Sequence, residues 1–418
     1  MRTLFLSLTI VFLASCCNSG SNKNTLPQKF NNNNTSEVSG FDIERLQRAD
    51  SVMALYVREG VMPNAVSFVA RNGVIVHHKA YGYRDAENKI PLKNTDIFRW
   101  ASQTKAITTA VALSLFEENK FLLDDPIERY LPMFANPPVY VSGSVENGNL
   151  VTRPANRSIT VRHLLTHTAG YSYNTFGEDL RIVNYAQPVT TKEIVERIAR
   201  TPLMHDPGDN YTYGFATDIL GYLCEVVSGK TLDVLMKERI FEPLGMNDTY
   251  FYIPENKRDR LVKMYTRPSN KTPYNLDTET IEQNYPFAVD QPFLGGGAGL
   301  SGPIEDYAKF CQMILNKGEF NNSRVLGVKT VELMTVNHFL DIPGNFQFSF
   351  GYEISAERNF NIDMRSVGAL IWGGLYGTSY IIDPKENMIL LFYTNVRNWN
   401  NPGVPDRFRV SIHQALIN

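Results

Sequence analysis

Residues 102–120 read SQTKAITTAVALSLFEENK, and the rest of the chain is expected to fold around this segment. It predicts a helix with apolar side chains on every side from Ala106 to Phe116, which is typical of a helix buried in the centre of a domain. The first turn carries Ser102 and Lys105, three residues apart. Side chains at this spacing lie on one face of a helix, so a hydroxyl and an amine are expected to project into the same space.

Strand patterns occur toward both ends of the chain. Ala65–Ala70 and Val74–Tyr83 are rich in β-branched residues, and Asn72-Gly73 between them is the strongest short signal for a hairpin turn. Near the C-terminus, Ser379–Ile382 and Met388–Tyr393 predict a second hairpin. Two hairpins far apart in the sequence can pair into one antiparallel sheet that both chain ends build.

The patterns between the hairpins are helical. Thr190 and Glu193 form a capping box, Asp218–Val227 runs to a stop at Gly229, and Pro303–Leu315 is a third helix. A closing helix is predicted at Asp406–Leu416. We therefore predict an α/β (α+β) fold, in which helices flank the antiparallel sheet and a mostly helical subdomain is inserted at about residues 120–300. A cleft between the two parts is the expected binding place.

Composition narrows the classes of function. A chain of 418 residues can bury a core large enough to hold a dry, preorganised site. Hydrophobic residues at 43% and charged residues at 20% are ordinary for a globular protein, so most of the chain is expected to fold. A net charge of -2 gives no broad cationic surface for a phosphate backbone, so no nucleic-acid partner is expected.

The N-terminus has the pattern of an export signal. Arg2 precedes an apolar run, Leu4–Leu13, that is too short to span a bilayer. Leu13-Ala14-Ser15-Cys16 resembles the lipobox of bacterial lipoproteins, in which cleavage before the cysteine is followed by its acylation. We expect residues 1–16 to form a lipoprotein signal segment ending at the lipidated Cys16, which makes the membrane a partner. The alternative is an ordinary signal peptide with incidental cysteines.

Residues 17–40 are rich in Asn, Ser and Thr, and predict a flexible tether between the anchor and a folded domain at 41–418. The expected location is that of an exported bacterial lipoprotein, in the periplasm or at the outer membrane or cell surface. Cys224 and Cys311 fall within apolar helical patterns and are expected to be buried free thiols.

Two other kinds of site are disfavoured. His163 and His167 are four residues apart, a spacing that can chelate zinc, but no glutamate lies between them as in H-E-x-x-H. We interpret them as structural and expect neither a metal nor another cofactor. The sequence contains no G-x-S-x-G nucleophile elbow, which argues against an α/β-hydrolase.

The pair Ser102 and Lys105 is a candidate for nucleophilic catalysis. A serine hydroxyl attacks poorly until a base removes its proton, and desolvation or nearby cations can fit a lysine for this task. The pattern S-x-x-K is weak evidence by itself. Two later segments strengthen it: Pro207–Gly221, a turn into a helix that contains Tyr213, and Trp372–Gly377, a glycine-rich edge before a strand.

In this order, Ser102-Gln103-Thr104-Lys105, the Tyr213 segment and Trp372-Gly373-Gly374 resemble the three motifs of the serine β-lactamase and penicillin-binding protein superfamily. The resemblance is to its class C-like branch and to family VIII carboxylesterases, with a β-lactamase/DD-peptidase-like fold for residues 41–418. It extends over most of the chain after about residue 42, including the segments Asp124–Ile127, His163–Gly170, Phe241–Met246 and Gly295–Leu300.

The resemblance implies an acyl-enzyme mechanism. Ser102 would attack a carbonyl, Lys105 and Tyr213 would move the protons, and water would release the acyl group. It further implies that the backbone N–H groups of Ser102 and Leu375 form the oxyanion hole, beside the third motif at Trp372, Gly373 and Gly374. Which of Lys105 and Tyr213 is the primary base is left open, because coupled groups titrate as a unit.

Two departures from the family pattern indicate the substrate. β-Lactamases and DD-peptidases commonly carry Asn two residues after the tyrosine and open the third motif with Lys or His, where this chain has Phe215 and Trp372. Trp372 offers an apolar face and one N–H donor but no positive charge, so anionic β-lactams lose their anchor. Trp-Gly-Gly resembles the esterase branch. We therefore expect a carboxylesterase acting on small or medium esters, with amide substrates also possible.

Two alternatives remain. One is a β-lactamase, D-Ala-D-Ala carboxypeptidase or D-amino peptidase (the same chemistry on an amide bond), and the other is a non-catalytic cell-wall-binding lipoprotein. Several aromatic residues are candidates for the wall of the pocket, although surplus aromatic residues more often belong to a core. These candidates are Trp100, Tyr171, Tyr173, Phe215, Phe293 and Tyr376.

Overall fold

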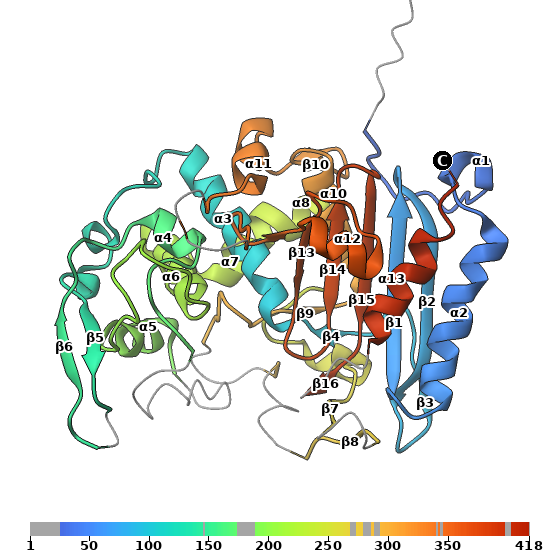
Figure 1. Ribbon diagram of the computed structural model, residues 1–418, viewed down its shortest axis with the longest axis horizontal. Helices are drawn as coiled ribbons and strands as arrows, with labels where there is room; N and C mark the ends of the chain where they lie inside the picture. The colour runs from blue at the N-terminus through green and yellow to red at the C-terminus, as the bar shows by residue number, and fades with distance from the viewer. Residues whose placement is uncertain are drawn as a thin grey trace, which may run out of the picture.

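The fold of the protein is given by a computed structural model, which describes residues 26–144, 147–173, 189–267, 273–278, 286–287, 293–339, 342, 346–397 and 403–417. At its centre is a seven-stranded antiparallel sheet in the order β12-β13-β14-β15-β1-β2-β3 (Figure 1). The strands are β1 (Asn64–Arg71), β2 (Val74–Asp85), β3 (Ile90–Pro91), β12 (Glu353–Ile354), β13 (Leu370–Gly373), β14 (Ser379–Asp383) and β15 (Met388–Tyr393). The prediction that both chain ends build one sheet is confirmed.

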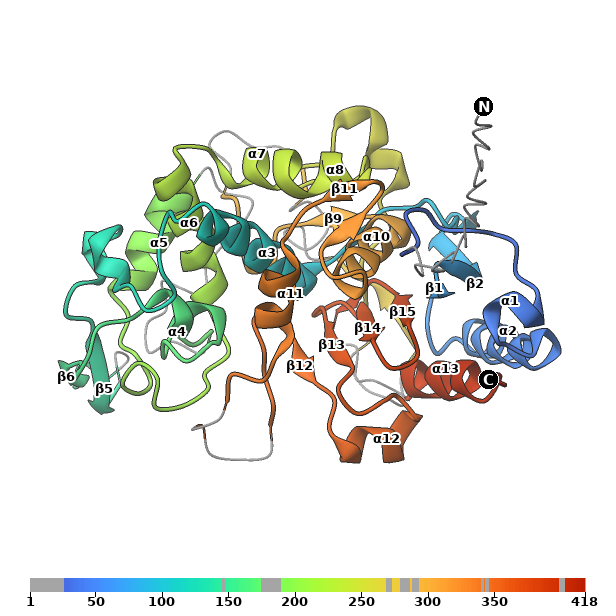
Figure 2. The same ribbon diagram turned by 90° about the horizontal axis from the view of Figure 1, so that it is seen from above.

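Helices cover both faces of this sheet (Figure 2). One face packs on α2 (Ile43–Arg58) and α13 (Val404–His413), and the other packs on α3 (Thr104–Glu117) and α10 (Ile304–Leu315). Every residue of β15 is buried because this central strand is covered on both sides, which explains its uninterrupted apolar sequence. The two hairpins turn at the predicted places, with Asn72 and Gly73 both at positive φ.

The buried helix differs in one detail from its prediction. Ser102 lies in a 3-10 turn, η1 (Ala101–Gln103), and the α-helix α3 starts only at Thr104. Residues 101–115 are buried with the exception of Ser102, which is half-buried. Ser102 is thus the one residue of this segment that reaches the surface.

The predicted helical insertion lies beside the sheet, on the left in Figure 1, and the capping predictions within it are confirmed. Thr190 and Glu193 cap α5 (Thr191–Ala199), and Gly229 ends α6 (Ala216–Ser228) at a φ of 72°. The shorter helices of the chain are α1 (Ser36–Ser39), η2 (Ile127–Arg129), η3 (Pro132–Phe134), α4 (Val161–Leu165), α7 (Leu232–Met236), η5 (Lys237–Phe241), α8 (Glu242–Leu244), η6 (Glu255–Arg260), α11 (Val328–Thr335) and α12 (Glu357–Asp363). The shorter strands are β4 (Phe98–Arg99), β5 (Pro138–Ser142), β6 (Val151–Pro154), β7 (Tyr265–Thr266), β8 (Asn275–Leu276), β9 (Ser301–Gly302), β10 (Glu319–Phe320), β11 (Ser323–Arg324) and β16 (Val396–Arg397).

Residues 26–40, the described part of the predicted tether at 17–40, include residues that pack on the domain. The Phe30 ring packs 4.9 Å from that of Phe68 and 5.2 Å from that of Phe320, and the Asn31 N–H donates to the Gly73 carbonyl over 2.9 Å. Burial of the apolar Phe30 ring stabilises the packing of this otherwise polar segment on the domain. The signal segment 1–16 and Cys16 lie outside the described residues.

The described part of the chain contains no helix with the length and apolar character needed to cross a membrane. Cys224 and Cys311 are buried free thiols, as predicted.

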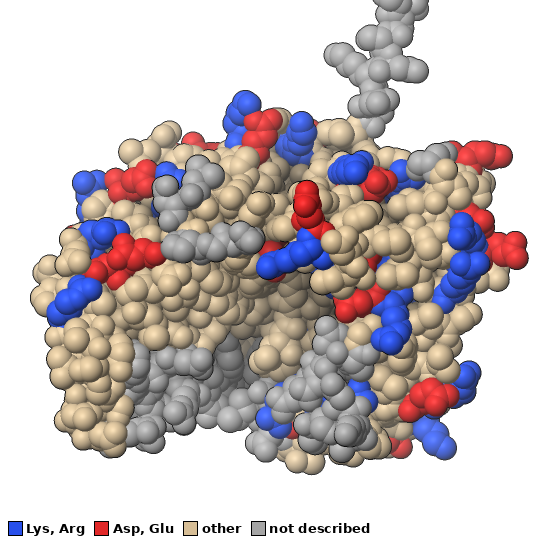
Figure 3. All heavy atoms as spheres, viewed as in Figure 1, with Lys and Arg blue, Asp and Glu red and all other residues tan. Residues whose placement is uncertain are grey.

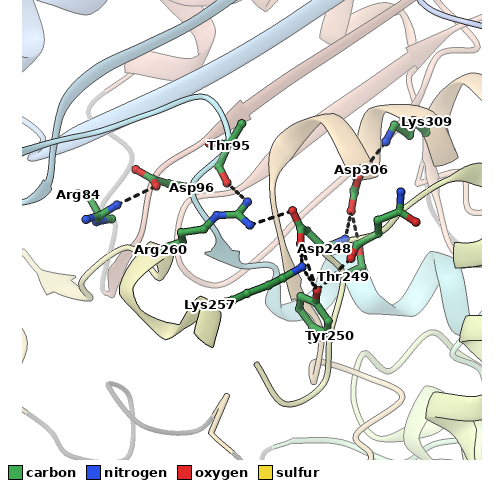
Figure 4. Close-up of polar contacts among 11 residues, drawn as sticks. Arg84, Thr95, Asp96, Asp248, Thr249, Tyr250, Lys257, Arg260, Asp306 and Lys309 are labelled. Carbon is green, nitrogen blue, oxygen red and sulfur yellow. Dashed lines mark hydrogen bonds and ion pairs between the residues drawn. The ribbon is translucent and has the colours of Figure 1, made fainter. Parts of the chain in front are cut away.

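A network of ion pairs and hydrogen bonds joins three segments of the chain (Figure 4). Asp248 accepts hydrogen bonds from Lys257 and from Arg260, and Arg260 also donates to the Thr95 carbonyl. The Asp248 N–H in turn donates to Asp306 on α10 over 2.9 Å. These contacts join α10, η6 and the segment before β4.

Candidate active site

Ser102 lies in a backbone turn of unfavourable geometry. Ala101, directly before it, has a φ of 47°, a region that L-residues other than Asn and Asp rarely adopt. The turn is held by the Thr104 hydroxyl, which donates to the Ala101 carbonyl over 2.7 Å, and by the Trp100 N–H, which donates to the Leu300 carbonyl over 3.0 Å. The surrounding structure thus fixes the Ser102 hydroxyl at the surface of a cleft.

Lys105 lies behind Ser102 and is 2% exposed. Its Nζ is 3.4 Å from Ser102 Oγ and donates to the Gly297 carbonyl over 2.7 Å and to the Tyr173 hydroxyl over 2.9 Å. The predicted meeting of hydroxyl and amine is therefore present in the structure. A buried amine whose donors have defined acceptors is held in one position, as proton transfer to or from Ser102 requires.

Two tyrosines flank this amine. The ring centroid of Tyr213 is 4.7 Å from Lys105 Nζ, and Tyr213 lines the same cleft as Ser102. Its hydroxyl donates to no other described residue. Lys105 instead hydrogen-bonds the hydroxyl of Tyr173, whose ring contacts that of Tyr213 with centroids 5.6 Å apart. The sequence places Tyr173 only among candidate wall residues and gives no signal for its contact with the lysine.

The third motif packs directly against the turn that carries Ser102. A Cβ on Gly374 would collide with the Trp100 carbonyl oxygen and the Thr378 hydroxyl, so only glycine fits this approach. Gly374 is followed by Leu375, whose side chain is 65% exposed and lines the cleft together with Trp372 and Gly373. The Leu375 N–H donates to no other described residue. It is therefore available to a developing oxyanion, as the family resemblance implies.

The cleft has a volume of about 470 Å³ and opens between the sheet and the helical region. Ser102, Tyr213 and Trp372 line one part of it. Behind Trp372, aromatic rings form a continuous cluster, in which the Trp372 ring contacts Tyr213 at 5.4 Å and Phe348 at 5.5 Å between centroids. Further members of this cluster are His167, Tyr211, Phe339 and Phe346.

Most of the aromatic residues proposed from the sequence as pocket wall lie elsewhere. Trp100 is fully buried, and its Nε1 donates to the Gly302 carbonyl over 2.9 Å. Tyr171 packs on Phe134, and Phe293 and Tyr376 are also buried. Phe215 is buried too and contacts the ring of Tyr173, at 4.7 Å between ring centroids. None of these five residues lines the cleft, because large rings at these positions fill the core beneath it.

Two buried titratable groups surround the Lys105 amine. Burial and the nearby Lys105 charge lower the pKa of His167 to about 3, so this imidazole is neutral near pH 7. Burial raises the pKa of Asp218, while the Lys105 charge and the Gly297 N–H, which donates to Asp218 over 2.9 Å, oppose that rise. Asp218 thereby fixes the loop whose carbonyl holds Lys105.

His163, the other histidine of the pair with zinc-like spacing, serves as a helix cap, since its Nδ1 accepts from the Thr160 N–H over 3.1 Å. The described residues include no cluster of three or more His, Cys, Asp or Glu side chains that could hold a metal ion. The arrangement of a half-buried hydroxyl, a buried amine and an unused backbone donor is suited to acyl transfer through a serine nucleophile.

Comparisons of this chain with protein families, with known proteins and with solved structures agree with one another. The family model described as Beta-lactamase matches residues 49–415. Esterase EstB of Burkholderia gladioli is 29% identical over 376 residues, which cover 83% of this chain and 90% of EstB. The solved structure of EstCE1, described as a hydrolase with promiscuous acyltransferase activity, superposes with a TM-score of 0.74 at 25% identity and covers 89% of this chain and 99% of EstCE1. The unliganded simvastatin synthase LovD of Aspergillus terreus also has a TM-score of 0.74 at 25% identity, with 90% and 98% of the two chains covered.

Proposed function

The chain belongs to the beta-lactamase family of serine hydrolases, and on this basis we propose that it is a carboxylesterase that cleaves small or medium esters through an acyl-Ser102 intermediate. Ser102 is the nucleophile, Lys105 and Tyr213 carry protons to and from it, and the N–H groups of Ser102 and Leu375 stabilise the oxyanion. Attack forms the Ser102–acyl bond and expels the alcohol, which takes up the serine proton. Water then cleaves the acyl-enzyme.

The observation that carries this proposal is the contact between Ser102 Oγ and the buried Lys105 Nζ, 3.4 Å apart at the edge of a cleft. The preference for esters rests on the neighbours of this pair. Trp372 presents an aromatic face in the cleft of Ser102, at the position where the β-lactamase pattern has a cation, and Phe215 replaces the amide of that pattern. An uncharged aromatic surface favours an apolar acyl or alcohol group over the carboxylate of a β-lactam. EstB is named an esterase and EstCE1 a hydrolase, which agrees with this choice.

The purified domain without residues 1–25 should hydrolyse p-nitrophenyl butyrate with a kcat/KM that exceeds its kcat/KM for nitrocefin by about 10- to 100-fold. The physical reason is that the carboxylate of nitrocefin finds no cation beside Trp372, and the loss of one charged hydrogen bond is worth about 1.5–3 kcal/mol. Initial rates measured by absorbance give both constants. Faster turnover of nitrocefin than of the ester would instead assign the chain to the β-lactamases.

We further propose that the domain is attached to a membrane through a lipid on Cys16, because the apolar run and small residues before this cysteine form a lipobox-like pattern. Cys16→Ala should move the protein from the membrane fraction of the expressing bacterium to the soluble fraction. Cys17→Ala, one residue further, is the matched control and should leave the protein in the membrane fraction. Membrane retention of the Cys16→Ala protein would contradict the lipid anchor.

A further inference from the structure

The cleft that begins at Ser102 continues past the end of β13 to a polar part on the other face of the sheet. Gly373 has no side chain at this point, and the cleft extends beside it to Ser379 and to two arginines, Arg365 and Arg409. Arg365 follows α12, and Arg409 extends from the C-terminal helix α13. The family motifs include none of these three polar residues.

The two arginines are held by the carboxylates of Asp363 and Asp406. Arg365 contacts Asp363 with both Nε and Nη2 over 2.6 Å, and Asp363 is fully buried. Arg409 Nη1 bonds Asp363 over 3.2 Å and Asp406 over 3.1 Å, and its Nη2 donates to the Ser379 hydroxyl over 3.3 Å. Each guanidinium is thus fixed in place by these contacts, and both arginines line the cleft.

These pairs do not use all the donors. A guanidinium has five N–H groups, and among the described residues the buried Arg409 Nε has no hydrogen-bond partner. Burial and the nearby Arg365 charge lower the pKa of Arg409, as expected where two cations are held close together. A bound anion would relieve this repulsion and accept hydrogen bonds from the two arginines where they line the cleft.

The cleft also contains one acid at this end. Glu353 on β12 lines it, and its nearest basic partner is Arg358 at 3.9 Å. Burial raises the pKa of Glu353. When ionised, this carboxylate opposes an anion at the two arginines. In the view of Figure 3, acidic and basic side chains lie together over α12 and α13, beside a hollow near the centre of this face.

We propose that Arg365, Arg409 and Ser379 form a subsite for a carboxylate at the far end of the substrate, so that the preferred esters carry an anionic group remote from the bond that is cleaved. This inference rests on the proposed esterase function and specifies its substrate class. Trp372 stands where the β-lactamase pattern has a cation, so a carboxylate next to the reacting carbonyl lacks that anchor, whereas the arginines accept one further along the cleft.

The test compares ester pairs of equal length that differ in one remote charge. Mono-p-nitrophenyl glutarate is paired with p-nitrophenyl pentanoate for the acyl side, and 3-carboxyphenyl butyrate is paired with phenyl butyrate for the alcohol side. We expect wild type to favour the anionic member of at least one pair in kcat/KM. In that pair, Arg409→Gln should lower the ratio of anionic to neutral kcat/KM about tenfold, and Glu353→Gln should raise it severalfold.

Arg409→Gln and Glu353→Gln should change the ratio of anionic to neutral kcat/KM in opposite directions. Damage to the fold would not produce opposite changes in this ratio. Arg409→Gln leaves the buried Asp363 paired with Arg365, and Arg409→Lys should recover part of the ratio. Arg58→Gln, an exposed arginine at the end of α2, is the charge-matched control and should leave the ratio as in wild type. Raising the salt concentration should also lower the wild-type ratio.

Two kinds of failure are distinguishable. If wild type hydrolyses none of the four esters, the proposed esterase function fails, and the subsite proposal fails with it. If wild type hydrolyses them but the ratios do not change in opposite directions in Arg409→Gln and Glu353→Gln, the function stands and the carboxylate subsite is wrong.

Discussion

Ser102→Ala is expected to lower kcat/KM for p-nitrophenyl butyrate by at least about 10⁴-fold, because removing the nucleophile of a serine hydrolase leaves only binding and oxyanion stabilisation. Covalent labelling by a fluorophosphonate should be lost in the same variant. The measurements are initial rates at several ester concentrations and the mass of the protein after treatment with the probe.

Ser114→Ala is the matched control for this variant, since Ser114 lies on the same helix, α3, and its hydroxyl donates to the Val111 carbonyl over 2.7 Å. It should retain labelling and activity. A Ser102→Ala protein that keeps either property would assign the nucleophile to another residue. A wild type that neither hydrolyses esters nor takes up the probe would favour a cell-wall-binding module.

Tyr213→Phe is expected to lower kcat for ester hydrolysis by about 10²- to 10⁴-fold, the usual contribution of a positioned general acid or base. Tyr213 lines the cleft with Ser102, and its hydroxyl is unused by other described residues, so it can meet the serine or the leaving group when substrate binds. Hydrogen bonds of catalytic groups are often completed only in that complex.

Tyr173→Phe is the matched comparison, because it removes a hydroxyl that contacts Lys105 and does not line the cleft. Its kcat should fall only about tenfold, through looser positioning of the amine. The pH dependence of kcat/KM, measured for both variants, distinguishes a residue that transfers protons from one that only positions Lys105. A larger loss in Tyr173→Phe than in Tyr213→Phe would transfer the acid/base role to Tyr173.

The amino-acid sequence alone was enough to predict the main secondary-structure elements of this protein. The apolar residues on all sides of 106–116 predict a buried helix, the turn at Asn72-Gly73 predicts a hairpin, and Gly229 predicts the end of α6. Such signals are local, since propensity, capping and turn conformation act within a few residues. The pairing of Ser102 with Lys105 is local for the same reason.

Other features depend on which segments meet in space. Tyr173 contacts Lys105, and Arg409 reaches the cleft from the last helix, although 68 and 304 residues respectively separate these two residues from Lys105 along the chain. No pattern at either position predicts these contacts. The same holds for Trp100 and Tyr171, whose burial depends on neighbours that only the packed core supplies. The sequence by itself determined the buried helix, the hairpins and the serine–lysine pair, because those features arise from short-range backbone and packing preferences. The tertiary structure alone decided which rings line the cleft and which arginines enter it, because that depends on how distant elements pack together.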